Sequence, residues 1–334
     1  MASVRMAILG CGGMAGAHAN RFKNHPDVRI VACCDVNPEV VEAYIAKHLA
    51  GYAPKPAIFT DPAAMYREAT PDAVTIVTPH TMHYAHGVQA LDAGCHVFME
   101  KPMVTAADQA HALAAKVAQT GKMLVVGYNS PCTPEMQFVR AAIRDGRFGK
   151  LELMSGFLSQ NWKTATAGTW RQKPELSGGG QAYDSGAHLL NSVCWSVESD
   201  IKQVFAVCDN LGTPVDINAT ITIQFTNGAT AGITISGNCV SSGALLTSVF
   251  ERGRIEVDGW GGSWIRVFKR EQIKYPVIPG KAQSPNDNFI DAVLGRAEPC
   301  TTARNGIIQS ELMDAIYASA ASGRPAQPVR AAHA

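Results

Sequence analysis

A glycine-rich turn between an apolar strand and a helical segment limits the possible folds of this chain more than any other feature. Residues Gly10–Ala15 read G-C-G-G-M-A, which has the form G-x-G-x-x-A, and Asp35 ends the next apolar run at the expected separation. The first glycine permits a tight turn, Gly12 lets backbone N–H groups approach a pyrophosphate, and the closing alanine lets helix and strand pack closely. The pattern therefore predicts a dinucleotide-binding βαβ unit, which is the core of a Rossmann fold.

Asp35 also bears on the choice of cofactor. A carboxylate at this place accepts hydrogen bonds from a ribose 2′-hydroxyl but repels a 2′-phosphate. No Arg or Lys occupies positions 36–43 to offset that repulsion. The sequence therefore favours NAD over NADP.

Strands and helices alternate through the first part of the chain. This alternation predicts a parallel sheet with right-handed crossovers and helices on both faces. This alternation of strands and helices ends after Gly127, so we expect a Rossmann domain over residues 1–127 and a second domain over residues 128–334. In the first domain the strands are expected at Arg5–Leu9, Arg29–Cys34, Val74–Val77, Val97–Met99 and Met123–Val126, and the helices at Gly13–Asn24, Pro38–Leu49, Met82–Ala93 and Ala106–Gln119.

The second domain is predicted to be an α+β unit with a mainly antiparallel sheet. Asn227-Gly228 stands between two strand patterns and suits a type I′ hairpin turn. Strands Thr220–Phe225 and Ala231–Ser236 carry apolar or small residues on both faces, which predicts a homodimer or homotetramer through this sheet. The other expected strands are Lys150–Ser159, Arg254–Val257 and Trp264–Phe268, and the helices are Thr133–Arg144, one near Asp184–Val197, Pro285–Leu294 and Thr302–Ser319.

Charge and cysteine usage exclude several classes of protein. The formal net charge is +1 over 334 residues, without the basic excess of a nucleic-acid or anionic-membrane binder. No apolar run is long enough for a membrane span or resembles a signal peptide. The nine cysteines are scattered without a Cys-x-x-Cys pair, which favours reduced thiols in a cytoplasmic protein.

Lys101, Asp184 and His188 are the candidate catalytic residues. Lys101 follows a predicted strand, and Asp184 and His188 are spaced i, i+4, so a helix would place them on one face. A histidine has a suitable pKa for proton transfer near neutral pH, and a cation stabilises a developing alkoxide. The alternative for the helix pair is a capping aspartate beside a buried structural histidine.

Three histidines follow the strand that ends at Val77. His80, His83 and His86 are spaced i, i+3, i+6, but no cysteine or carboxylate accompanies them, and the spacing spans too much helical rotation for one ion. We therefore predict no metal site. Thr78-Pro79-His80 should instead lie near the nicotinamide, with His83 as a structural hydrogen-bonding group.

Taken together, these motifs resemble the Gfo/Idh/MocA family, the glucose–fructose oxidoreductase and inositol dehydrogenase group. The resemblance rests on the turn Gly10–Ala15, Glu100-Lys101-Pro102 and the run from Gly178 to His188, and it covers nearly the whole chain. It implies a large open sheet in the C-terminal domain, catalysis by Lys101, Asp184 and His188, and sugar or polyol substrates. The chain departs from the family at Asn191, where aspartate is frequent, and at Tyr128–Cys132, where an arginine is frequent.

The expected function is NAD-dependent hydride transfer at a carbinol carbon of a sugar or polyol. The alternatives are an NAD-dependent glycosidase that acts by transient oxidation and elimination, a keto-sugar reductase, and a non-catalytic sensor. The predicted cofactor-binding residues are Gly10, Gly12, Gly13, Met14, Ala15, Asp35, Thr78, Pro79, His80, His83, Glu100 and Lys101. The predicted substrate-binding residues are Lys101, Asn129, Trp162, Trp170, Arg171, Asp184 and His188.

Overall fold

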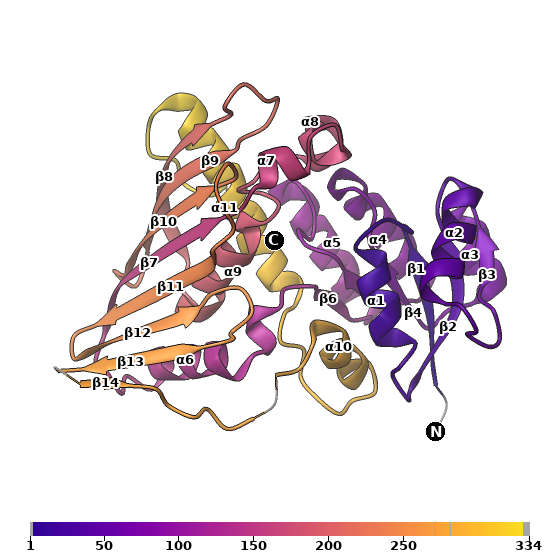
Figure 1. The fold of residues 1–334 in the computed structure, drawn as a ribbon, viewed down its shortest axis with the longest axis horizontal. Coiled ribbons are helices and arrows are strands. Elements are labelled where there is room, and N and C mark those ends of the chain that lie inside the picture. Colours follow the sequence, from indigo (N-terminus) through magenta and orange to yellow (C-terminus); the bar gives the residue numbers. More distant parts are fainter. Residues whose placement is uncertain (1–2, 271, 281, 330–334) are drawn as a thin grey trace. The chain divides into compact units, whose positions relative to one another are not determined.

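The computed structural model of the protein describes residues 3–270, 272–280 and 282–329, which form two compact units (Figure 1). The first unit contains Met1–Val104, Gln109–Gly127 and Ser284–Gly306. The second contains Thr105–Asp108, Tyr128–Gln283 and the chain from Ile307 onward. Within the described ranges, no helix has both the length and the hydropathy of a membrane span.

The first unit is built on a six-stranded sheet in the order β3-β2-β1-β4-β5-β6 (Figure 1). Every neighbouring pair is parallel, which confirms the predicted Rossmann sheet. The strands are β1 Val4–Leu9, β2 Val28–Cys34, β3 Ala57–Phe59, β4 Ala73–Ile76, β5 His96–Met99 and β6 Leu124–Val126. The helices are α1 Ala15–Phe22, α2 Pro38–His48, α3 Pro62–Ala69, α4 His83–Asp92, α5 Ala107–Thr120 and α10 Pro285–Val293, with the 3₁₀ turn η1 at His80–Met82.

Strand β3 and helix α3 were not predicted. The strand has three residues, of which one is exposed and two are half-buried, so it lacks the apolar run of the central strands. The helix has an N-cap signal in the sequence. Asp61 directly precedes Pro62, and its side chain accepts hydrogen bonds from the N–H groups of Ala63 and Ala64. An Asp-Pro pair of this kind is the local signal that could have revealed the helix.

The second unit is built on an eight-stranded sheet in the order β14-β13-β12-β11-β7-β10-β9-β8. Strands β7 and β10 pair in parallel and the remaining neighbours are antiparallel, which confirms the mainly antiparallel prediction. The strands are β7 Leu151–Ser159, β8 Ile201–Asp209, β9 Asn218–Phe225, β10 Thr230–Ser236, β11 Gly243–Phe250, β12 Gly253–Asp258, β13 Ile265–Lys269 and β14 Gln272–Lys274. The helices are α6 Pro134–Arg144, α7 Trp162–Ala165, α8 Pro174–Ser177, α9 Gly186–Val197 and α11 Ala303–Ser322, with 3₁₀ turns η2 Ser130–Cys132 and η3 Trp170–Gln172.

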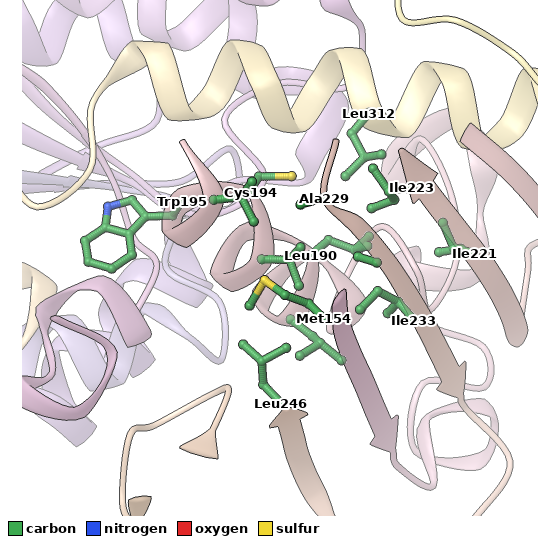
Figure 2. Close-up of a cluster of buried hydrophobic side chains, with 14 of the residues drawn as sticks. Met154, Leu190, Cys194, Trp195, Ile221, Ile223, Ala229, Ile233, Leu246 and Leu312 are labelled. Carbon is green, nitrogen blue, oxygen red and sulfur yellow. The ribbon is translucent and has the colours of Figure 1, made fainter. Parts of the chain in front are cut away.

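One face of the second sheet is covered by α6, α9 and α11. Alternate strand residues such as Ile221 and Ile233 point into this core, where they meet Leu190 of α9 and Leu312 of α11 (Figure 2). All residues of α9 are buried, the polar His188, Asn191, Ser192 and Ser196 among them. Burial of one large aliphatic side chain contributes roughly 1.5–3 kcal/mol, which makes this layer the main support of the second unit.

The β9–β10 hairpin turn differs from the predicted type I′ geometry. That turn needs a positive φ at both central residues, but only Gly228 of the pair has one, at 90°. Instead the Phe225 N–H bonds the Ala229 carbonyl, and the side chain of Asn227 accepts from the Ala229 N–H at 3.0 Å. The side chain of Asn227 therefore stabilises a longer loop with one left-handed glycine.

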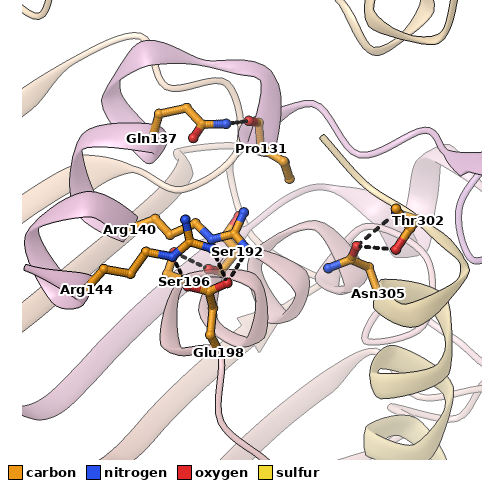
Figure 3. Close-up of polar contacts among 9 residues, drawn as sticks. All are labelled: Pro131, Gln137, Arg140, Arg144, Ser192, Ser196, Glu198, Thr302 and Asn305. Carbon is orange, nitrogen blue, oxygen red and sulfur yellow. Dashed lines mark hydrogen bonds and ion pairs between the residues drawn. The ribbon is translucent and has the colours of Figure 1, made fainter. Parts of the chain in front are cut away.

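An ion-pair cluster joins the end of α9 to α6 (Figure 3). The carboxylate of Glu198 pairs with Arg140 and Arg144, and Arg140 also stacks on Trp195 at 4.2 Å. Burial is the largest single influence and opposes ionisation, but the two arginines together outweigh it and lower the pKa of Glu198 from an ordinary 4.5 to about 2. The carboxylate contribution to stability is therefore fully present above pH 4.5 and lost as the pH falls towards 2.

Glu198→Gln is expected to lower the free energy of unfolding by about 1–2 kcal/mol at neutral pH, because two arginines lose a charged partner. The difference from wild type should shrink between pH 4.5 and pH 2. Denaturant titrations across this range measure it, with Glu68→Gln in the exposed Arg67–Glu68 pair as the control. A difference that stays constant with pH would contradict the assignment.

Candidate active site

The glycine-rich turn of the first unit lies between β1 and α1. Gly10 has a φ of 90°, and a Cβ there would lie 2.8 Å from the Val77 carbonyl carbon, so only glycine fits. Around Gly12 and Gly13 a Cβ would meet nothing within 4 Å, which leaves the backbone of the turn open to a ligand. An open turn with N–H groups at a helix N-terminus fits the pyrophosphate of a dinucleotide. Of the neighbouring predicted residues, Met14 is 47% exposed and Ala15, the first residue of α1, is buried.

Asp35 is tied to that turn. Its Oδ2 accepts from the Cys11 N–H at 2.9 Å, and its Oδ1 accepts from the Asn37 N–H at 3.3 Å. These two donors orient the carboxylate at the end of β2, and they leave each oxygen further lone pairs for a ribose hydroxyl. The arrangement fits the adenosine ribose of NAD.

His83 joins two turns of the first unit and has no exposed surface. Its Nδ1 lies 2.7 Å from the Pro102 carbonyl oxygen, and its Nε2 lies 2.9 Å from the Thr78 carbonyl oxygen. Burial lowers the pKa of His83. His80 is also buried, and His86 contacts the Thr78 hydroxyl at 3.0 Å. Each ring nitrogen of His83 faces a backbone carbonyl, and a neutral imidazole has one N–H, so the ring donates to one of the two carbonyls at a time. His83 thus lies between the turns that follow β4 and β5.

Glu100-Lys101-Pro102 follows β5 directly. Glu100 is 9% exposed, and its Oε2 accepts from the Lys101 N–H at 3.1 Å. The Lys101–Pro102 peptide bond is cis, and the Pro102 carbonyl oxygen lies 2.7 Å from His83 Nδ1. The backbone of Lys101 is thus held on both sides at the carboxyl end of the parallel sheet, where ligands bind in such folds.

Asp184 lies in the second unit, just before α9. The predicted i, i+4 arrangement on one helix is wrong, because α9 begins at Gly186 and Asp184 belongs to the preceding turns. In these turns the Gly186 N–H bonds the Gln181 carbonyl, which is not an α-helical pairing. Asp184 is 5% exposed, and its Oδ2 accepts from the Trp162 indole N–H at 2.7 Å and from the Arg171 Nε at 3.1 Å.

Trp162 and Arg171 therefore both contact the candidate catalytic acid. Trp162 is 4% exposed, and Arg171 also stacks on Trp170 with its guanidinium carbon 4.5 Å from the ring centre. The guanidinium and the indole N–H both donate to one oxygen, which fixes the orientation of the carboxyl group. Asn129, the remaining predicted substrate contact, is half-buried at the start of η2.

His188 is held between two aromatic rings. The ring of Trp260 stacks on it with centroids 4.2 Å apart and planes 21° apart, and Tyr128 meets it edge-on at 5.8 Å. Ser192 Oγ lies 2.9 Å from the His188 carbonyl oxygen and 2.6 Å from the Gly259 carbonyl oxygen, which ties the β12–β13 turn to α9. His188 is 7% exposed, so its ring orientation is set by this packing. Asn191, one turn further along α9, is 2% exposed, and its Nδ2 has no hydrogen-bond partner among the described residues.

Asp216 supports the turn before Asp184 and was not predicted from the sequence. Its carboxylate accepts from the N–H groups of Gly180 and Ala182, both at 2.8 Å, and from the Tyr317 hydroxyl at 2.6 Å. A Cβ at Gly180 would lie 1.9 Å from the Asp216 carbonyl oxygen, which explains the glycine. Since the Asp184 N–H bonds the Gly180 carbonyl at 2.9 Å, Asp216 supports the turn that carries Asp184.

In the described part of the chain, no three His, Cys, Asp or Glu side chains form a group that could hold a metal ion. Among the candidate residues, Lys101 of the first unit offers a cation, and Asp184 and His188 of the second unit offer a carboxylate and an imidazole. These groups suit proton transfer and the stabilisation of an alkoxide.

Two models of one protein family match consecutive parts of the chain. Residues 4–128 match an oxidoreductase family with an NAD-binding Rossmann fold, and residues 136–265 match the Gfo/Idh/MocA C-terminal domain. D-glucoside 3-dehydrogenase of Escherichia coli K12 is 30% identical over 193 residues, which are 58% of this chain and 53% of that protein. Inositol 2-dehydrogenase of Rhizobium meliloti is 33% identical over 153 residues, which are 46% of this chain and 44% of that protein.

The chain thus spans about half the length of these two curated relatives. Its fold is similar to that of the WlbA dehydrogenase from Bordetella pertussis, crystallised in complex with NADH and UDP-GlcNAcA. The TM-score is 0.86 at 24% identity, and the likeness covers 98% of this chain and 100% of the other. At 24% identity this similarity supports the assignment of the fold alone.

Proposed function

Because this chain belongs to the Gfo/Idh/MocA family of NAD-binding oxidoreductases, we propose that it transfers hydride between NAD and a carbinol carbon of a sugar or polyol. The observation that carries the proposal is the presence of Lys101 just after β5, of Asp184 just before α9 and of His188 in the first turn of that helix. The named activities of the two curated relatives, on a glucoside and an inositol, support this class of substrate.

Each of the three residues has one task in the proposed reaction. Lys101 donates a hydrogen bond to the reacting oxygen and stabilises the developing alkoxide. His188 accepts the hydroxyl proton as general base, and its ring is kept in place by Trp260. Asp184, oriented by Trp162 and Arg171, accepts a hydrogen bond from a neighbouring substrate hydroxyl. NAD, when bound, takes up or returns the hydride.

A panel of sugars, inositols and glycosides with NAD tests the proposal. We expect at least one polyhydroxylated substrate to produce reduced nicotinamide, measured by its absorbance. Glycoside cleavage without net reduction of NAD would instead support the transient-oxidation glycosidase. Binding of NAD without turnover of any member would count against an enzyme.

Asp35 should decide the cofactor preference. We expect a higher catalytic efficiency with NAD than with NADP, because the carboxylate at the end of β2 repels a 2′-phosphate. Asp35→Ser combined with Val36→Arg should narrow the difference, since it removes that charge and adds a cation. Steady-state kinetics with both cofactors measure the preference, and equal efficiency in wild type would refute it.

The uncovered face of the second sheet supports self-association, which we propose as a homodimer or homotetramer. Leu245, Phe157, Thr234, Thr220 and Val207 lie side by side across five neighbouring strands. The three apolar members of this row are 41–58% exposed. The row carries no charge, so a second copy can face it without repulsion.

Phe157→Glu is expected to convert the oligomer to monomer, because it places a charge within this row. Light scattering at micromolar concentration measures the mass, with Thr226→Glu in the β9–β10 turn as the control. A wild-type protein that is monomeric under these conditions would contradict the proposal.

We further propose a reducing compartment, such as the cytoplasm. All nine cysteines lie among the described residues, and none of them forms a disulfide. Burial raises the pKa of several of these thiols, including Cys194 to about 12. Thiols that stay protonated at neutral pH behave as small apolar side chains in the core.

A further inference from the structure

A buried series of hydrogen bonds in the first unit connects α1 to the backbone of Lys101. His18 on α1 is 2% exposed, and its Nε2 lies 2.8 Å from Oε1 of Glu100. The other oxygen of Glu100, Oε2, accepts from the Lys101 N–H at 3.1 Å. One carboxylate therefore connects the imidazole of His18 with the main chain of Lys101.

Asn286 on α10 shows which atom donates and which accepts in these hydrogen bonds. Arg21 Nη1 donates to Asn286 Oδ1 at 3.0 Å, which fixes the orientation of the amide. Asn286 Nδ2 then lies 2.9 Å from His18 Nδ1, closer than the 3.3 Å of its Oδ1. An amide nitrogen only donates, so Nδ1 of His18 must accept.

The proton of a neutral His18 is therefore on Nε2. From that position it is donated to Glu100, and Glu100 in turn accepts from Lys101. Arg21, Asn286, His18 and Glu100 form an ordered series of hydrogen bonds that ends at the candidate catalytic residue. Each hydrogen bond in the series joins a donor to an acceptor, as a stable buried polar network requires.

Aromatic packing holds the imidazole in place. The ring of His18 meets Phe98 of β5 at 5.2 Å with planes 61° apart, and Phe98 packs in turn on Phe289 of α10 at 5.7 Å. Phe22, one turn along α1, lies 6.5 Å from the same imidazole. Phe98 and Phe22 therefore pack against the ring of His18, while its two nitrogens face Asn286 and Glu100.

We propose that His18 is a positioning residue for hydride transfer, which acts through Glu100 on Lys101. The inference rests on the proposed function, since it assumes that the Lys101 ammonium contacts the reacting oxygen. That ammonium ends a flexible four-carbon stem, so its position depends on a fixed backbone at the stem's base. His18 and Glu100 hold this backbone from one side, and His83 holds the Pro102 carbonyl from the other.

A double-mutant cycle tests the proposal. His18→Leu should lower kcat about 10- to 100-fold with the Kd for NAD nearly unchanged, because a displacement of about 1 Å at a reacting group can cost a hundredfold. His18→Gln should recover most of this loss, since its side-chain amide can donate to Glu100. In the Lys101→Ala background, His18→Leu should change kcat less than about twofold, because the two residues then act as one unit.

Val41→Ala is the matched control, a cavity variant in the same hydrophobic core. It should lower the melting temperature and leave kcat unchanged. If His18→Leu lowers kcat equally in the wild-type and Lys101→Ala backgrounds, His18 acts independently of Lys101 and the inference fails. If Lys101→Ala turns over like wild type, the proposed function fails instead. If Lys101→Ala is inactive and His18→Leu has the kcat of wild type, the proposed function stands and only the positioning role of His18 is refuted.

The tautomer of His18 can be measured without any substrate. In ¹⁵N-histidine-labelled protein, the ring signals that disappear in His18→Gln identify His18. We expect the neutral Nε2–H form in wild type. In Asn286→Asp we expect the doubly protonated ring, because a carboxylate then faces Nδ1 and requires a donor there. An Nδ1–H tautomer in wild type would overturn the inferred direction of the series.

Discussion

Replacing Lys101 with alanine is expected to lower turnover by about a hundredfold or more, since one well-placed electrostatic donor contributes that much to a transition state. The charge on the reacting oxygen develops only during the reaction, so the loss should fall on kcat more than on substrate affinity. NAD binding should be nearly normal, because the open turn at Gly12 and the carboxylate of Asp35 are untouched. A binding titration with NAD beside steady-state kinetics separates the two effects.

His188→Ala serves as the comparison for this prediction. It should also bind NAD and lose most activity near neutral pH, but it should recover partly at high pH, where hydroxide can replace the base. Lys101→Ala should show no such recovery, because hydroxide cannot supply the missing cation. Near-wild-type turnover of Lys101→Ala would mean that the active site has been assigned wrongly, and it would favour the non-catalytic sensor.

Gly180→Ala is expected to cost at least about 3 kcal/mol of stability, since overpacking against a fixed backbone combines with damage to a buried hydrogen-bond network. The added Cβ would lie 1.9 Å from the Asp216 carbonyl oxygen and 2.6 Å from its nitrogen, so the main chain must move. This corresponds to a fall in melting temperature of roughly 6–12 °C for a domain of this size. Turnover should fall as well, because the Gly180 carbonyl binds the Asp184 N–H.

Asp216→Asn tests the hydrogen bonds between Asp216 and the turn at Gly180 without introducing a steric clash. It keeps one carbonyl acceptor but replaces the second with an amide donor, so the N–H of Gly180 or Ala182 loses its partner. We expect a smaller loss of stability than for Gly180→Ala, of about 1–3 kcal/mol. Calorimetry of both variants beside Lys101→Ala, which should melt like wild type, measures the effect. A Gly180→Ala protein that melts within about 1 °C of wild type would show that this turn is not rigid.

The fold of the first unit is readable from the sequence because its signals are local. The apolar runs of the central strands, the G-x-G-x-x-A turn at Gly10 and the acid at Asp35 each lie within a few residues of the element they define. Strand β3 was missed because it is short and only partly buried, and β8 and β11 were also missed. Both of these longer strands expose apolar side chains such as Phe205 and Leu245, which obscures the alternation expected of a half-buried strand.

The sequence by itself singled out Lys101, Asp184 and His188 as candidates for the reaction, and it correctly placed Lys101 after a strand and His188 on a helix. It placed Asp184 on that helix as well, whereas the structure has it in the turns before α9. The tertiary structure alone decided what holds them. Asp216 binds the turn at Gly180, Trp260 stacks on His188, and His18 reaches Glu100, and each of these pairs is far apart along the chain. Hydrogen bonds and ring contacts between distant residues leave no periodic pattern in a sequence. They depend on how sheets and helices bring side chains together, and only the folded chain specifies that.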